Sequence, residues 1–180
     1  MNGYCEPVPG LVGTNSRWAR LPLWGTFSSG AWVVANGATY VPIIVPTTCV
    51  ARRMWWANGA TVSASYNVEA GIYAGTLSGD PGIKVITTGS VAQGTASQVQ
   101  FADITDTVLP PGSYWMFMSC SSTSATFMRA AVPAGGRWNE LVILIQGSVA
   151  PGSAPATATP GEPESGDVVP LFGFATTASP

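Results

Sequence analysis

The feature of the sequence that most constrains the fold is a repeated alternation of short β-branched or aromatic runs with glycine- and proline-containing turns, clearest in residues 66–122. Asp-Pro-Gly at residues 80–82 suits a tight turn, because proline presets the first central angle of a β-turn and glycine accepts the positive φ that can follow. Residues 110–113 repeat this chemistry and precede residues 114–118 (YWMFM), the most strand-like run of the chain. The rhythm of strand, turn and strand predicts an antiparallel sheet of the kind found in sandwiches and barrels.

Side-chain alternation within these runs predicts how deeply each strand is buried. Residues 66–73 alternate in the manner of a half-buried strand, whereas residues 114–118 are apolar on both faces. We therefore expect the second strand to be central in its sheet, or to be covered on its outer side by another subunit. The alternation in residues 98–109 changes phase beside Asp103, which predicts a bulge or a corner. No stretch has the period of a helix of ordinary length.

A tight hairpin is predicted at Asn58-Gly59, the dipeptide most typical of a type I′ turn. The strand before it ends with Trp55 and Trp56, which fall on opposite faces of a sheet. We expect residues 60–66 to run back as the next strand, with both tryptophans near the rim.

Composition divides the chain into three parts. Residues 39–147 hold the predicted domain, an all-β antiparallel β-sandwich that is jelly-roll-like. Residues 1–38 form an extended N-terminal arm or accessory strands. Residues 148–180 form a second arm, a linker rich in proline, alanine and threonine that ends in an apolar tip.

Both arms carry large apolar side chains that need a surface to cover them. Eight of these are candidate subunit-interface residues: Trp18, Trp24, Trp32, Val168, Val169, Leu171, Phe172 and Phe174. Either they dock on a neighbouring subunit, by filling a groove or adding a strand, or they pack on their own sandwich. Under the first alternative, deleting residues 166–180 would leave the sandwich folded.

The chain is unusually poor in charge. Charged residues make up 9% of it, against about 25% in an ordinary soluble domain. A net charge of −2 with scattered basic residues predicts no nucleic-acid partner. The longest apolar runs are shorter than the roughly 20 residues that cross a bilayer, so we expect no membrane partner. A surface with so little charge suits burial against neighbouring subunits.

The amino-terminal residues and the cysteines bear on where the protein is made. The first seven residues have neither a basic start nor an apolar core, so we expect no secretory signal and synthesis in the cytoplasm. Cys5, Cys49 and Cys120 are odd in number and widely spaced, which fits neither a disulfide framework nor a zinc site. We expect mainly buried thiols, and one bridge between any two of them stays open as an alternative.

Few residues could perform chemistry. The chain has no histidine, which removes the commonest general base and the commonest zinc or copper ligand. Lys84 is the one lysine, and Asp103 and Asp106 lie beside a predicted turn, where aspartate usually caps backbone amides. We therefore predict no enzyme activity, no catalytic site, no metal site and no cofactor.

Trp55, Trp56 and Tyr73 are the candidate ligand-binding residues. Aromatic rings exposed at the rim of a sandwich can stack on sugars or fit protein pockets. Packing in the core is the competing interpretation, because tryptophan is highly buried on average.

Five segments carry a resemblance to a known group of proteins: NVEAGIY at 67–73, TGS at 88–90, QVQ at 98–100, DITD at 103–106 and LPPGSYW at 109–115. With these segments the chain resembles the small β-sandwich or jelly-roll proteins of tailed-bacteriophage virions, which include minor tail, tail-fibre-like, head-fibre and decoration proteins. The resemblance covers about a third of the chain.

The resemblance implies a non-enzymatic structural protein of the virion, a tail or appendage component involved in host attachment. It implies a homo-oligomer, with a trimer favoured, whose partners are tail or capsid subunits and a glycan of the host surface. Two alternatives remain open: a capsid decoration or cement protein that stabilises the head, and a carbohydrate-binding module. The sequence does not distinguish head from tail, and it names neither the receptor nor the copy number.

Overall fold

The computed structural model describes residues 17–19, 27–131, 144–161 and 168–176. These residues form thirteen β-strands and no helix, and all neighbouring strands pair antiparallel. The predicted all-β class is therefore confirmed. Among the described residues, none belongs to a helix that could span a membrane.

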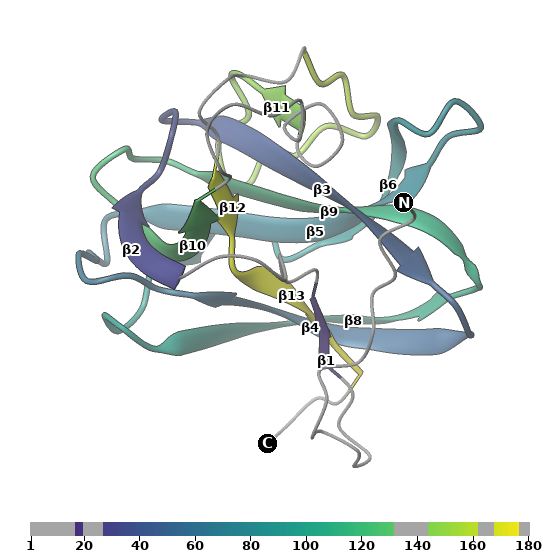
Figure 1. Ribbon diagram of the computed structural model, residues 1–180, viewed down its shortest axis with the longest axis horizontal. Coiled ribbons are helices and arrows are strands. Elements are labelled where there is room, and N and C mark those ends of the chain that lie inside the picture. The colour runs from purple at the N-terminus through teal and green to yellow at the C-terminus, as the bar shows by residue number, and fades with distance from the viewer. Residues whose placement is uncertain (1–16, 20–26, 132–143, 162–167, 177–180) are drawn as a thin grey trace.

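The largest of three sheets, here named the central sheet, runs through the middle of the molecule (Figure 1). Its strand order is β11-β3-β9-β5-β6, and β7 pairs with β5 beside this path. The strands are β3 (Gly37–Val45), β5 (Asn67–Gly75), β6 (Pro81–Thr87), β7 (Val91–Ala92), β9 (Gly112–Cys120) and β11 (Leu144–Gln146).

Two further sheets complete the sandwich. The facing sheet packs below the central sheet in the order β1-β13-β4-β8, and the side sheet stands at the left end in the order β12-β10-β2 (Figure 1). The facing strands are β1 (Arg17–Ala19), β4 (Cys49–Ala57), β8 (Val99–Leu109) and β13 (Phe172–Ala175). The side strands are β2 (Phe27–Ala31), β10 (Thr126–Ala131) and β12 (Val168–Pro170).

The main core lies between the central and facing sheets. Val41, Ile72 and Met116 contribute to it from the central sheet, and Trp56 and Phe174 from the facing sheet, all of them fully buried. Alternate residues of β5 enter this core, which confirms the alternation predicted for residues 66–73. The prediction that the strand is half-buried is corrected, because Glu69 and Tyr73 on its other face are 2% and 0% exposed beneath residues 147–161.

Residues 147–161, here named the strap, cover the outer side of the central sheet. The Ala158 N–H donates to the Gly82 carbonyl and the Lys84 N–H to the Ala156 carbonyl, each at 2.9 Å, so the strap is held to the edge strand β6. Beneath it lies a second apolar cluster of Ala38, Tyr40, Tyr73, Trp115, Phe117, Val149, Ala154 and Ala158. The outer face of β9, predicted to be covered, is thus covered by a segment of the same chain. The prediction that the first part of residues 148–180 is only a linker is corrected.

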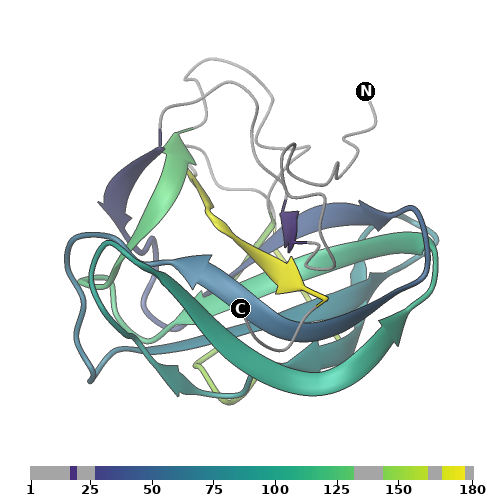
Figure 2. The same cartoon turned by 90° about the horizontal axis from the view of Figure 1, so that it is seen from below.

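The apolar tip near the C-terminus folds back onto its own sandwich. β12 pairs with β10, and β13 pairs with β4, in the register Phe172 with Trp56 and Phe174 with Met54. Figure 2, seen from below, shows β13 beside β4 in the facing sheet. Of the two alternatives for this tip, the structure shows packing on its own domain. Deletion of residues 166–180 would therefore remove core side chains, and the prediction that the sandwich survives it is corrected.

The prediction of a tight hairpin at Asn58-Gly59 is wrong. β4 ends at Ala57, and no strand runs back over residues 60–66. Instead the Asn58 N–H donates to the Gln98 carbonyl and the Gly59 N–H donates to the Thr126 carbonyl, so the chain crosses towards the side sheet. The sequence signal was overridden by the amide side chain of Asn58, which is buried and donates to the Thr95 carbonyl and to Gln100 Oε1, both at 3.1 Å.

The irregularity predicted beside Asp103 is confirmed. The register between β4 and β8 shifts between Ala51 and Arg53, whose partners on β8 are Thr107 and Asp103. Such a shift re-aims the side chains on both sides of it. It allows two charged pairs to form across the same two strands.

Candidate functional site

The predicted ligand-binding aromatics are core residues. Trp56 and Tyr73 are 0% exposed and Trp55 is 7% exposed. Trp56 enters the main core, whereas Trp55 lies on the other face of β4 with Ala175, against the partly buried Leu171 and Phe101. The prediction that these rings are exposed for stacking on a ligand is therefore corrected, because both faces of β4 are covered.

Tyr73 belongs to the cluster beneath the strap. Its ring centroid lies 5.4 Å from that of Tyr40 in an edge-on arrangement. The Tyr73 hydroxyl donates to the Pro155 carbonyl and the Tyr40 hydroxyl donates to Gln146 Oε1, both at 2.8 Å. Burial raises the pKa of both phenols, and the nearby Glu69 carboxylate adds to the rise. Both rings are therefore neutral hydrogen-bond donors that hold the strap and its flanking residues in place.

Glu69 is the most deeply buried carboxylate among the described residues, at 2% exposure. Its Oε2 atom accepts hydrogen bonds from the Gly152 N–H at 2.8 Å and from the Ala154 N–H at 3.2 Å. Gly152 has a φ of +93°, a conformation that favours glycine, and this turns the strap so that both amides point at one oxygen. Lys84 Nζ donates to the Ala154 carbonyl at 2.7 Å. These contacts fasten the strap and leave no open cleft around the carboxylate.

The two aspartates weighed as reactive groups form ion pairs across β4 and β8. Asp103 Oδ1 accepts from Arg53 Nη2 at 2.7 Å and from Arg53 Nε at 3.0 Å. Asp106 lies 3.2 Å from Arg52 Nε. The Arg53 guanidinium also lies 5.2 Å from the centre of the Phe101 ring, within the range of a cation–π contact. In the part of the chain that the structure describes, no group of three or more histidine, cysteine, aspartate or glutamate side chains could hold a metal ion.

The predicted interface residues are mostly internal where they are described. Trp32 is 6% exposed and packs edge-on against Phe127, and Val169 and Phe174 are buried in the main core. Phe172 is buried with them, and Leu171 is half-buried beside Trp55. The interface role predicted for these five is corrected, since each already contacts its own chain. Trp24 lies outside the described residues, and of Trp18 and Val168 only the strand pairing is described.

The exposed apolar side chains are different residues from those predicted. Leu77 is fully exposed at the tip of the turn between β5 and β6, and Ile83 and Val108 are 68% and 61% exposed. The sequence does mark Leu77, because it is the one large apolar residue in the turn sequence Thr-Leu-Ser-Gly-Asp. The sequence alone does not show that its side chain is exposed, because that depends on the turn projecting from the sandwich.

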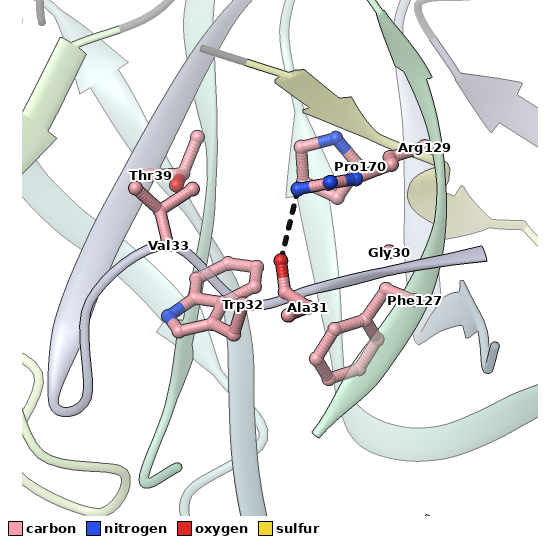
Figure 3. A pocket seen from close by; sticks show the side chains of 8 residues that line it. All are labelled: Gly30, Ala31, Trp32, Val33, Thr39, Phe127, Arg129 and Pro170. Carbon is pink, nitrogen blue, oxygen red and sulfur yellow. Dashed lines mark hydrogen bonds between the residues drawn. The ribbon is translucent and has the colours of Figure 1, made fainter. Parts of the chain in front are cut away.

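A shallow hollow lies at the opposite end, between the side sheet and the start of β3 (Figure 3). Its lining is Gly30, Ala31, Trp32, Val33, Thr39, Phe127, Arg129 and Pro170. Arg129 crosses the edge of the hollow and donates from Nη1 to the Ala31 carbonyl at 2.9 Å. The enclosed space of about 10 Å³ is roughly what one water molecule occupies.

No protein family and no curated protein matches this sequence. The fold has a weak likeness to two solved structures of a viral capsid protein. One is the structure of infectious bursal disease virus, Gt strain, with 13% identity and a TM-score of 0.30, over 94% of this chain and 44% of that chain. The other is a mutant VP2 protein of the same virus in T=1 particles, with 13% identity and a TM-score of 0.30, over 95% of this chain and 44% of that one. The chain thus spans less than half of either structure, and at this TM-score no functional argument rests on the likeness.

Proposed function

We propose that this protein is a non-enzymatic structural component of a virion, of the tail or appendage type, that packs against other subunits and takes part in host attachment. The observation that carries the proposal is how few charged side chains the described part of the sandwich has, and that most of them already have a partner. Of the eight charged side chains described, four form the two ion pairs between β4 and β8, and Glu69 and Lys84 are engaged by the strap.

A surface of this kind is suited to contact with other proteins. Its exposed apolar side chains Leu77, Ile83 and Val108 lie on segments rich in threonine, serine and glycine, with Asp80, Lys84 and Asp106 as the nearest charged residues in sequence. Burying such a surface removes apolar area from water while stripping few charges of their hydration, which is the costly part of forming an interface. The resemblance to phage virion proteins described for segments within residues 67–115 adds the tail or appendage location to this proposal.

The experiment is immunogold labelling of purified virions with antibody raised against the isolated protein. Label on the tail or its appendages is the expected result. Label spread over the head would support the alternative, a capsid decoration protein, and heated particles lacking the protein should then lose their heads. Virions that carry no label at either place would refute the proposed function.

The carbohydrate-binding alternative is not proposed further for Trp55, Trp56 and Tyr73. Each ring is covered on both sides by its own chain, and a stacking platform needs one open aromatic face. If the virion protein binds a host glycan, other residues provide the contact.

A further inference from the structure

The turn between β5 and β6 is held in one shape by a dense set of hydrogen bonds. The Thr76 N–H donates to the Asp80 carbonyl at 2.8 Å, and the Asp80 N–H donates to the Thr76 hydroxyl at 3.0 Å. The Ser78 hydroxyl donates to Asp80 Oδ2 at 2.9 Å. From below, the buried Trp115 ring donates its indole N–H to the Gly79 carbonyl at 3.1 Å.

This rigid turn presents a single apolar side chain. Leu77 extends fully into solvent, while its neighbours in the turn are tied to one another. An apolar side chain carried on a backbone that is already fixed needs less ordering when it meets a partner than one on a mobile loop, which favours association. We refer to residues 76–80 as the Leu77 turn.

The hollow described above lies at the other end of the molecule. β3 and β5 both pair antiparallel with β9, and Gly37 and Val68 both lie opposite Cys120, so the start of β3 and the start of β5 are at the same end of the central sheet. The Leu77 turn lies beyond the far end of β5. Figure 1 shows β2 and β10 at the left end and the turn between β5 and β6 at the right end. The lining of the hollow includes the rings of Trp32, Phe127 and Pro170 and one charged side chain, Arg129 (Figure 3).

The charges at the two ends are complementary. Among the eight charged side chains described, Asp80 in the turn and Arg129 at the hollow are the two that are neither in an ion pair nor engaged by the strap. A guanidinium has five N–H donors, and the contacts described for Arg129 use one of them. A carboxylate arriving with the turn would find donors at the hollow.

From these observations we infer that one copy of this protein docks its Leu77 turn over the Trp32–Phe127–Pro170 hollow of a second copy, with Asp80 of the turn meeting Arg129. The space of about 10 Å³ is too small to admit a leucine side chain, so Leu77 lies across the mouth of the hollow and closes it to water. Because the two surfaces are different and lie at opposite ends, the contact is head-to-tail and repeats from copy to copy, giving a ring if the rotation closes and a chain if it does not. The inference does not depend on the virion role, since it concerns the isolated protein.

The test is sedimentation velocity of the full chain over a wide concentration range. We expect species larger than a dimer to grow with concentration and to shrink with added salt. Leu77→Ser should weaken association about tenfold or more, since a buried leucine side chain contributes at least that factor. Ile83→Ser is the matched control, because Ile83 is equally apolar, exposed and near the turn but outside it, and it should associate like the wild type.

A mixing experiment tests the head-to-tail geometry. Val33→Glu places a negative charge at the edge of the hollow, on a side chain that is 40% exposed and so does not disturb the core. This variant retains an intact turn, and Leu77→Ser retains an intact hollow. Each alone should associate at least about tenfold more weakly than the wild type, and an equal mixture should form 1:1 dimers that grow no further.

Three results would overturn the inference. They are a wild type that stays monomeric up to millimolar concentration, a Leu77→Ser variant that associates like the wild type, and a mixture that forms either no complex or one larger than a dimer. A failure here leaves the immunogold result unaffected, so the docking contact and the virion role can be refuted separately.

Discussion

Replacing Glu69 with alanine tests whether a buried carboxylate holds the strap on the central sheet. In the native structure, one oxygen of Glu69 accepts from the Gly152 and Ala154 amides. Alanine removes the acceptor and leaves both amides without this partner. Since Ala154 is 7% exposed, water replaces the lost bond poorly there, whereas Gly152 is exposed and can be hydrated.

The magnitude follows from the two bonds. A hydrogen bond to a charged group contributes about 1.5–3 kcal/mol, and the longer bond, to Ala154, is at the upper limit of normal length. Full loss at Ala154 and partial loss at Gly152 give an expected destabilisation of about 2–4 kcal/mol for Glu69→Ala. Glu69→Gln keeps a neutral acceptor of the same shape, so it should cost roughly half as much.

The assay is urea unfolding of the wild type and the two variants at one protein concentration, followed by tryptophan fluorescence. Hydrogen exchange at the Ala154 amide should also accelerate in Glu69→Ala by more than the global destabilisation explains, because the strap opens locally. A Glu69→Ala variant within about 0.5 kcal/mol of the wild type would refute the clamp, as would a glutamine variant that is as unstable as the alanine variant.

Three further predictions concern buried groups. Burial raises the folded-state pKa of Tyr40 and Tyr73, so their contribution to stability is complete below pH about 10 and is lost as the pH rises further. Unfolding by base should therefore coincide with the appearance of tyrosinate absorbance at 295 nm. Absorbance from all tyrosines well before unfolding would contradict this prediction. Phe174→Ala should destabilise by about 3–5 kcal/mol in thermal or urea unfolding, since its ring is 0% exposed in the main core, and a near-neutral effect would mean that β13 is not docked. Burial also raises the pKa of the Cys120 thiol, so iodoacetamide should label it only after denaturant is added; rapid labelling of native protein would count against its burial.

Much of the fold was predictable because strand periodicity is a local property. The alternation in residues 66–73 and the two apolar faces of residues 114–118 depend on the period of two along a strand, and the structure has both. The phase change beside Asp103 was local too, and it corresponds to the register shift between β4 and β8.

The misplaced residues depend on what covers them, which is not a local property. Trp55 and Tyr73 are aromatic positions on β-strands, and nothing near them in the sequence shows that Leu171 and Pro155 will reach them. The hairpin prediction at Asn58 was wrong for the same reason, because the buried side chain of Asn58 donates to the Thr95 carbonyl on a distant loop. A covering segment would have been expected to be poor in proline and glycine, whereas the strap is rich in both.

Among the described strands, β13 is the last to leave the ribosome, yet it occupies the interior of the facing sheet, between β1 and β4. Until it is synthesised, β4 keeps an open edge and the core lacks two phenylalanine rings. Sheets closed by contacts so distant in sequence fold slowly and late. Polypeptides terminated before Phe172 should therefore fail to fold.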